Sequence, residues 1–187
     1  MIGIIDLKLR YLEEKKELNK IFNSTLKKGN LVLTDEVKEF ENNICKFTKS
    51  KYCVGLNSGT DALMLSLMMN GIKRGDEVIT TPISFIATLG AITHIGAIPV
   101  FVDVGDDLNI NPDLIEKAIT NKTKAIVPVH WGGKICQMDK ISKIAKKYKI
   151  KIIEDAAQAL GSHYKGKHAG TFGDIATLSF YPAHHIT

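Results

Sequence analysis

The sequence predicts an α/β fold: a mainly parallel, doubly wound sheet covered by helices on both faces. Short apolar runs rich in β-branched residues alternate with segments of helical periodicity along most of the chain. The strand candidates are apolar almost throughout, which is typical of strands buried on both faces. No repeat, low-complexity segment or interdomain linker interrupts this alternation.

Two helices are expected at the start of the chain. Residues about 10–28 have helical spacing with Glu/Lys pairs, and Gly29-Asn30 ends the pattern. The second helix runs from Asp35 to about Lys49, with acidic residues in its first turns. The elements expected next are a strand at Tyr52–Leu56, a helix from Thr60 to about Asn70, a strand at Glu77–Thr80 and a helix at Phe85–Ile95.

The second half continues the alternation of strands and helices. A strand rich in β-branched residues is expected at Ile98–Val104, followed by a helix at Pro112–Thr120 that proline opens near its first turn. The remaining elements are strands at Ala125–Val129, Ile150–Glu154 and Ile175–Phe180, and a helix at Met138–Tyr148.

Composition indicates an ordinary globular protein, with 44% hydrophobic and 24% charged residues in 187. No apolar run is long enough to span a membrane, and the charged start makes a signal peptide unexpected. The three cysteines are odd in number and lack C-x-x-C spacing, so free thiols in the cytoplasm are expected. The net charge of +5 comes largely from scattered lysines without interleaved aromatics, which favours a solvated face over a nucleic-acid surface.

Candidate ligand groups lie at the carboxyl ends of the predicted strands, where doubly wound sheets bind ligands. Asn57-Ser58-Gly59-Thr60 precedes a helix, so Gly59 permits close backbone approach and Thr60 offers a hydroxyl beside free N–H groups. This is a phosphate cradle, with plain helix capping by Ser58 as the alternative. Ser179, at the end of the last strand, either binds the phosphate or faces solvent.

Three further residues fit a flat, positively charged ring. Phe85 can stack on such a ring, with a place in the core as the alternative. Asp155 follows a buried strand, where a carboxylate needs a partner such as a protonated pyridine nitrogen; turn capping is the alternative. Gln158 lies three residues further on and can contact the ring or its hydroxyl.

The histidines do not predict a metal site. His184 and His185 are adjacent, but the chain has no second pair at ligand spacing. The other candidates are scattered along the sequence: His130, His163 and His168.

Several motifs together resemble the DegT/StrS-type sugar aminotransferases. They are N-S-G-T-D-A-L (57–63), G-D-E-V-I-T (75–80), P-V-F-V-D-V (99–104), I-E-D-A-A-Q-A-L-G (153–161), G-T-F-G-D-I-A-T-L-S-F (170–180) and the final Y-P-A-H-H-I-T. The family consists of fold type I pyridoxal-phosphate enzymes acting on nucleotide-linked keto-sugars in bacterial surface-polysaccharide (including lipopolysaccharide) and antibiotic pathways. The resemblance covers essentially the whole chain.

The resemblance implies pyridoxal 5′-phosphate or pyridoxamine 5′-phosphate as the cofactor. The residues implied to bind it are Gly59, Thr60 and Ser179 at the phosphate, Phe85 on the ring face, Asp155 at the pyridine nitrogen and Gln158 near the ring hydroxyl. A nucleotide-linked keto-sugar, an amino-acid amino donor and a homodimer with shared sites are implied as partners. Nothing indicates binding to nucleic acid or membranes.

The chain departs from the commonest family pattern at His184. Aminotransferases of this family have a Schiff-base lysine four residues after the phenylalanine of the Ser-Phe pair, and this chain has histidine there. Imidazole cannot hold the cofactor covalently, but a histidine near the C4′ atom can transfer protons as a general base. The motif resembles the branch that removes the C3 hydroxyl from CDP- or GDP-linked 4-keto-6-deoxysugars with non-covalently held pyridoxamine phosphate.

Other positions resemble ordinary aminotransferases. Iron–sulfur 3-dehydratases carry a cluster cysteine two residues after the aspartate, where this chain has Ala157, and V-H-W-G-G (129–133) is aminotransferase-like. These positions favour an aminotransferase, whereas His184 favours a C3-dehydratase, which we prefer; of the dehydratases, the cluster-free type that regenerates its own pyridoxamine from an amino acid fits better. A pyridoxal-phosphate-dependent sugar aminotransferase is the first alternative, and a non-catalytic cofactor-binding relative is the second.

Members of this family continue well beyond the position of Thr187. Residues 1–187 are therefore expected to hold the N-terminal segment and most of the cofactor-binding large domain, without the rest of that domain or the small C-terminal domain. For these residues alone we expect reduced stability and weak or no activity; full turnover would contradict this.

Overall fold

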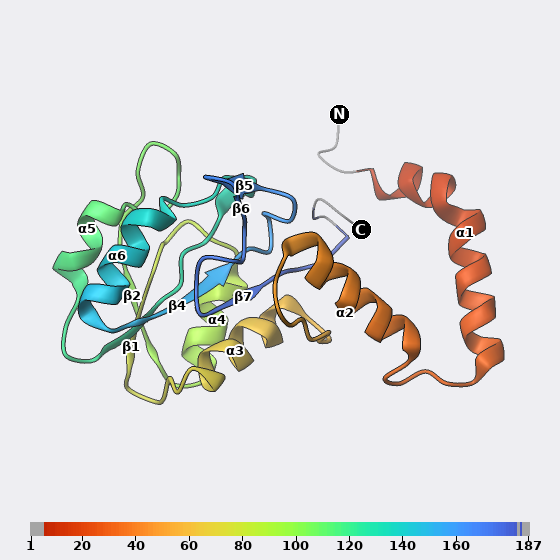
Figure 1. The fold of residues 1–187 in the computed structure, drawn as a ribbon, viewed down its shortest axis with the longest axis horizontal. Coiled ribbons are helices and arrows are strands. Elements are labelled where there is room, and N and C mark those ends of the chain that lie inside the picture. The colour runs from red at the N-terminus through yellow and green to blue at the C-terminus, as the bar shows by residue number, and fades with distance from the viewer. Residues whose placement is uncertain (1–5, 183, 185–187) are drawn as a thin grey trace. The chain divides into compact units, whose positions relative to one another are not determined.

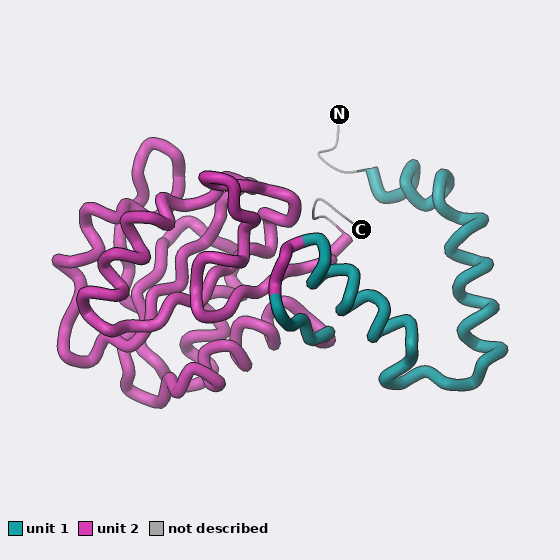
Figure 2. The backbone as a smooth tube through the Cα atoms, viewed as in Figure 1, with its two compact units in different colours: residues 1–47, 51–55 teal, residues 48–50, 56–187 magenta. Residues whose placement is uncertain are grey.

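The structure, a computed structural model, describes residues 6–182 and 184. The chain divides into two compact units, coloured separately in Figure 2. The first comprises residues 1–47 and 51–55, and the second comprises residues 48–50 and 56–187. All the candidate site residues belong to the second unit.

Two helices form most of the first unit: α1 (Leu7–Lys28) and α2 (Asp35–Thr48). The carboxylate of Asp6 caps α1 by accepting the Leu9 N–H at 2.9 Å. Gly29 ends α1 in the left-handed conformation, with φ of 67°. Both expected helices are confirmed, the first of them beginning at Leu7.

The strand expected at Tyr52–Leu56 is wrong, because the structure has an irregular segment there. Its alternating apolar residues suit a half-buried strand, yet the side chains of Tyr52 and Val54 are 76% and 73% exposed. Side-chain alternation makes a strand only where a neighbouring strand supplies backbone partners.

The second unit contains a five-stranded, wholly parallel sheet in the order β2-β1-β3-β4-β7. Its strands are β1 (Glu77–Thr80), β2 (Ile98–Phe101), β3 (Thr123–Ile126), β4 (Lys151–Asp155) and β7 (Ile175–Thr177). Because the strands are parallel, their carboxyl ends meet at one edge of the sheet. The pairing ends earlier than expected in β2, β3 and β7, so the chain leaves the sheet sooner at this edge.

Helices cover both faces of the sheet, as the doubly wound prediction requires (Figure 1). One face packs against α3 (Gly59–Met69) and α4 (Ile86–His94), and the other packs against α5 (Pro112–Ala118) and α6 (Met138–Tyr148). Successive strand residues divide between two buried clusters: Ile153 faces α3 and α4, and Ile152 faces α5 and α6. The α/β fold prediction is confirmed.

Two small elements were not expected from the sequence. A 3-10 turn, η1 (Trp131–Gly133), follows β3, and a short antiparallel hairpin joins β5 (His163–Tyr164) to β6 (Lys167–His168). In the part of the chain that the structure describes, no helix is long and apolar enough to cross a membrane. All three cysteines are free thiols.

Candidate cofactor site at the carboxyl edge of the sheet

Asp155 lies at the centre of the candidate site, as the last residue of β4. Its carboxylate is only 6% exposed. One oxygen accepts the Thr88 hydroxyl of α4 at 2.6 Å, and the other accepts the Ala157 N–H at 3.3 Å. Ser84 lies 2.6 Å from the Thr88 hydroxyl, and it is the donor there because Thr88 gives its own proton to Asp155.

The environment of Asp155 favours a positively charged partner. Burial raises the pKa of its carboxyl above the ordinary 3.8, and the hydrogen bonds from Thr88 and Ala157 act in the opposite direction. The net shift is upward, so the ionised form is poorly stabilised within the chain alone. A cation placed against this carboxylate would remove that penalty.

At the place where the sequence predicts a phosphate cradle, α3 begins beside the end of β7. A Cβ atom at Gly59 would lie 3.3 Å from the Cβ of Ser179 and 3.5 Å from its hydroxyl. Ser58 caps α3, since its hydroxyl accepts the Asp61 N–H at 3.0 Å. Capping by Ser58 is confirmed, and it leaves room for a phosphate at Gly59, Thr60 and Ser179, which stays a prediction; the missing side chain of Gly59 keeps the space beside Ser179 open.

Substituting Gly59 with alanine is expected to separate stability from phosphate binding. The crowding against Ser179 costs about 1 kcal/mol, and alanine in place of helical glycine recovers up to about 1 kcal/mol, so unfolding free energy should change little. Affinity for pyridoxal phosphate should fall about tenfold or more because the new methyl group fills the cradle.

The matched control is Gly90→Ala in α4, where a new Cβ meets nothing within 4 Å. This variant should gain about 0.5–1 kcal/mol of stability and keep its cofactor affinity. Urea unfolding and titration with pyridoxal phosphate measure both quantities. Equal cofactor affinity of the Gly59→Ala variant and the unsubstituted protein would contradict the cradle.

His184 has an unsatisfied polar atom in its ring. Its Nδ1 is buried and has no hydrogen-bond partner among the residues that the structure describes. The ring packs edge-on against Tyr181 with centroids 5.6 Å apart, and it lies close enough to Asp155 to interact with that carboxyl group. A buried ring nitrogen of this kind marks a place for a ligand group or a proton. His185 lies outside the described residues.

Two further predicted ring-binding residues, Phe85 and Gln158, come from the segments that follow β1 and β4. Phe85 precedes α4 and is 68% exposed, so its expected alternative as a core residue is wrong and its ring remains available for stacking. The Oε1 atom of Gln158 accepts the Gly132 N–H of η1 at 2.8 Å. The amide nitrogen of Gln158 then remains for a ligand, together with the second lone pair of Oε1.

These residues suit a planar, phosphate-bearing ring with a protonated nitrogen. A buried carboxylate, an open glycine cradle, an exposed aromatic ring and a buried unsatisfied imidazole nitrogen belong to one edge of the sheet. Sequence reasoning missed the Ser84–Thr88–Asp155 chain, for which the one-turn spacing of the two hydroxyl residues was the available signal. It also missed the buried contact between His130 and Glu154, whose Nε2 and Oε2 atoms are 3.0 Å apart.

Comparison with known proteins identifies the family. The model of the DegT/DnrJ/EryC1/StrS aminotransferase family matches residues 12–187. The chain belongs to this family. A pleiotropic regulatory protein of Geobacillus stearothermophilus is 40% identical over 99% of the chain and 50% of the relative. The UDP-2-acetamido-2-deoxy-3-oxo-D-glucuronate aminotransferase of Pseudomonas aeruginosa is 41% identical over 98% of the chain and 51% of the relative.

Solved structures agree with the fold. DesV of Streptomyces venezuelae, in complex with a ketimine intermediate, superimposes with a TM-score of 0.93 at 38% identity, covering 98% of this chain and 50% of that one. NtdA of Bacillus subtilis, with bound cofactor PMP, gives a TM-score of 0.87 at 38% identity, covering 93% of this chain and 39% of that one. The DegT/DnrJ/EryC1/StrS chain described here spans about half the length of these relatives.

Proposed function

We propose that this family member binds pyridoxal or pyridoxamine 5′-phosphate and removes the C3 hydroxyl of a nucleotide-linked 4-keto sugar in surface-polysaccharide biosynthesis. The observation that carries the proposal is His184, which stands in the lysine position and has a buried, unsatisfied Nδ1 near Asp155. An amino-acid amino donor, a homodimeric assembly and a cytoplasmic location belong to the same proposal.

Each described residue of the site has a binding role in this proposal. Asp155 holds the pyridine nitrogen in its protonated state, and the hydroxyl chain from Ser84 through Thr88 fixes that carboxylate. Phe85 covers one face of the ring, and the amide nitrogen of Gln158 meets the ring hydroxyl. The phosphate group lies in the cradle of Gly59, Thr60 and Ser179. The bound cofactor supplies an electron sink for the substrate.

His184 acts as the proton-transfer group at the C4′ atom of the cofactor. A neutral imidazole accepts a proton near physiological pH, and a positioned base of this type contributes about 10²–10⁴-fold to a rate. Since histidine forms no covalent link to the cofactor, binding depends entirely on the non-covalent contacts of the site. This is the property that separates the proposal from a lysine-based transaminase.

Sugar transamination is the second candidate, and the relatives favour it. The Pseudomonas aeruginosa relative is named an aminotransferase, and another at 42% identity is named dTDP-3-amino-3,6-dideoxy-alpha-D-galactopyranose transaminase. A regulatory, non-catalytic role is the third candidate function, because the Geobacillus stearothermophilus relative is named a pleiotropic regulatory protein. Both alternatives use the same cofactor site.

Borohydride reduction followed by denaturation distinguishes the candidates. The protein is incubated with pyridoxal phosphate, reduced, unfolded in denaturant and tested for retained cofactor by absorbance. Release of all the cofactor, together with water loss from a CDP- or GDP-linked 4-keto-6-deoxysugar in the presence of pyridoxamine phosphate, supports the dehydratase. A stable adduct would instead favour transamination through a lysine, and failure to bind either cofactor form would favour the non-catalytic role.

A further inference from the structure

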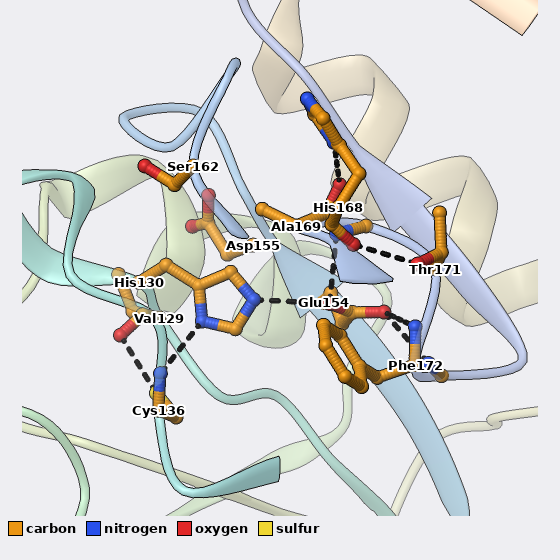
Figure 3. A network of polar contacts seen from close by, with 12 residues as sticks. Val129, His130, Cys136, Glu154, Asp155, Ser162, His168, Ala169, Thr171 and Phe172 are labelled. Carbon is orange, nitrogen blue, oxygen red and sulfur yellow. Dashed lines mark hydrogen bonds and ion pairs between the residues drawn. The ribbon is translucent and has the colours of Figure 1, made fainter. Parts of the chain in front are cut away.

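Glu154, the residue before Asp155 on β4, is a wholly buried carboxylate that the proposed reaction does not use. Neighbouring strand residues point to opposite faces, so Glu154 faces away from the ligand side, toward His130 and Phe172 (Figure 3). One of its oxygens accepts from His130 Nε2 at 3.0 Å and from the Gly170 N–H at 2.9 Å. The other accepts the N–H groups of Phe172 and Gly173 at 2.7 and 2.6 Å.

All four partners of Glu154 are donors. His130 accepts the Cys136 N–H at its Nδ1 atom, 3.3 Å away, which leaves the ring proton on Nε2 facing Glu154 (Figure 3). The other three partners are backbone N–H groups, which only donate. Both oxygens of Glu154 therefore act as acceptors, and a group with any N–H or O–H of its own does not fit.

The four donors come from two segments that lead to opposite sides of the cofactor site. His130 begins the η1 turn, whose Gly132 N–H holds the carbonyl end of Gln158. Gly173 leads into β7 and is pressed against β4, since a Cβ there would lie 2.7 Å from the Ile152 carbonyl oxygen. Ser179 lies two residues beyond the end of β7. Glu154 thus connects the η1 turn, which binds Gln158, with the turn at residues 170–173, which leads through β7 to Ser179.

We propose that Glu154 is a positioning residue which, through His130 on one side and the 170–173 turn on the other, sets the spacing between Gln158 and the Ser179 cradle. The proposal rests on the cofactor site described above. Glu154 touches neither the cofactor nor the substrate; it acts on the ring-hydroxyl end and the phosphate end of the site together.

The test is the Glu154→Gln variant, which keeps the shape and replaces one acceptor oxygen by a donor. In either amide orientation an N–H group faces two donors, so one of the two segments must move. We expect the affinity for pyridoxal phosphate to fall about tenfold or more, measured by titration at a temperature where far-ultraviolet circular dichroism shows the native fold.

Two readouts do not need the cofactor. Trp131 is the only tryptophan of the 187 residues and belongs to η1, so its emission reports on the His130 side. Amide hydrogen exchange at Gly170, Phe172 and Gly173 reports on the other side. If the amide nitrogen of the Glu154→Gln variant replaces the oxygen that accepts from Phe172 and Gly173, we expect faster amide exchange at these two residues. If it replaces the oxygen that accepts from His130 and Gly170, we expect a shifted Trp131 emission. The affinity for pyridoxal phosphate should fall in both orientations.

The matched control is Glu77→Gln at the opposite edge of the sheet, at the start of β1. Its carboxylate accepts the hydroxyls of Thr120 and Thr123, which can turn and accept from an amide. We expect this variant to match the unsubstituted protein in cofactor affinity, Trp131 emission and exchange at residues 170–173.

If Glu154→Gln does not fold, His130→Gln replaces it, because the three backbone donors then keep their acceptor. This variant should shift Trp131 emission and weaken cofactor binding while leaving exchange at Phe172 and Gly173 unchanged. Unaltered emission, exchange and cofactor affinity in the folded variants would overturn the positioning role and leave the proposed function intact. If the unsubstituted protein binds no cofactor, the proposed function fails; the emission and exchange changes then support the role of Glu154, and their absence overturns it.

Discussion

The Asp155→Asn variant is expected to bind pyridoxal phosphate about 100-fold more weakly or worse, and yet to be more stable than the unsubstituted protein without cofactor. The affinity loss follows because a buried cation left without its counter-charge costs about 3–5 kcal/mol, and about 1.4 kcal/mol is tenfold in affinity. The amide keeps an acceptor oxygen for Thr88 but turns its NH2 group toward the Ala157 N–H, so the long 3.3 Å bond from Ala157 is lost. We expect a net gain in stability because removing the buried charge outweighs this single weak bond.

The stability gain depends on pH in a defined direction. The pKa of Asp155 is raised in the folded state by burial, so the protonated carboxyl favours folding below the ordinary 3.8 and that contribution is lost as pH rises through the folded pKa. The unfolding free energy of the unsubstituted protein should therefore fall below that of the Asp155→Asn variant as the pH rises from about 4 toward neutrality. Thermal unfolding of both cofactor-free proteins at several pH values measures this.

The control is Asp174→Asn, because the pKa of Asp174 is shifted in the opposite direction to that of Asp155. Burial acts to raise the pKa of Asp174, but the bonds from Lys151 and the Ile152 N–H outweigh it, and the net pKa is lowered. This carboxylate therefore stabilises the fold above the ordinary 3.8, and its contribution is lost as pH falls through the folded pKa. Asp174→Asn should destabilise the protein at neutral pH without affecting cofactor affinity. A cofactor-free Asp155→Asn protein less stable than the original at pH 8 would contradict our account of Asp155.

The His184→Ala variant is expected to lose about 10²–10⁴-fold in the rate of C3 hydroxyl removal, because the proton-transfer group is gone. Cofactor affinity should change only a few-fold, since His184 makes no covalent link and the carboxylate, cradle and stacking contacts remain. Single-turnover water loss with saturating pyridoxamine phosphate measures the rate, and a cofactor titration measures the affinity.

His184→Lys tests the same position from the other direction. This variant should gain a borohydride-stable cofactor adduct that survives denaturation and should lose the dehydration activity. His94→Ala, at an exposed position in the last turn of α4, is the control and should behave as the unsubstituted protein. A His184→Ala protein with the full dehydration rate would contradict the assigned role.

The fold was predictable from the sequence where periodicity and burial coincide. The bounds of β1 (Glu77–Thr80) and α6 (Met138–Tyr148) match the expected ones, because apolar runs there are bordered by clear turn residues. The segment Tyr52–Leu56 carries the same kind of pattern but is irregular in the structure, and a strand depends on pairing with another strand, which its own residues do not encode.

The candidate site was predictable only as far as single strand ends. Asp155 stands at a strand end, where a parallel sheet presents ligand groups, so its position follows from topology. Gly59 does not follow a strand, because the segment before it is irregular; it lies at the start of α3, close to Ser179 beyond the end of β7. The contacts that complete the site join distant segments, such as Thr88 to Asp155 and His130 to Glu154. Local patterns record neighbours along the chain, and these pairs become neighbours only after the sheet has formed. The unsatisfied Nδ1 of His184 is likewise a property of packing.

The two adjacent carboxylates of β4 also restrict how this strand can be aligned during folding. A slip of one residue turns every side chain of a strand to the opposite face. In a slip that brings Asp155 to the place of Glu154, its shorter carboxylate would face four N–H donors arranged for glutamate. The same slip would bury Glu154 in the place of Ile153, among the apolar residues that pack with α3 and α4. The apolar residues Ile152 and Ile153 are similar enough to exchange faces at little cost, so they discriminate weakly between the two alignments. The order Glu-Asp therefore specifies the register of β4 in the sheet.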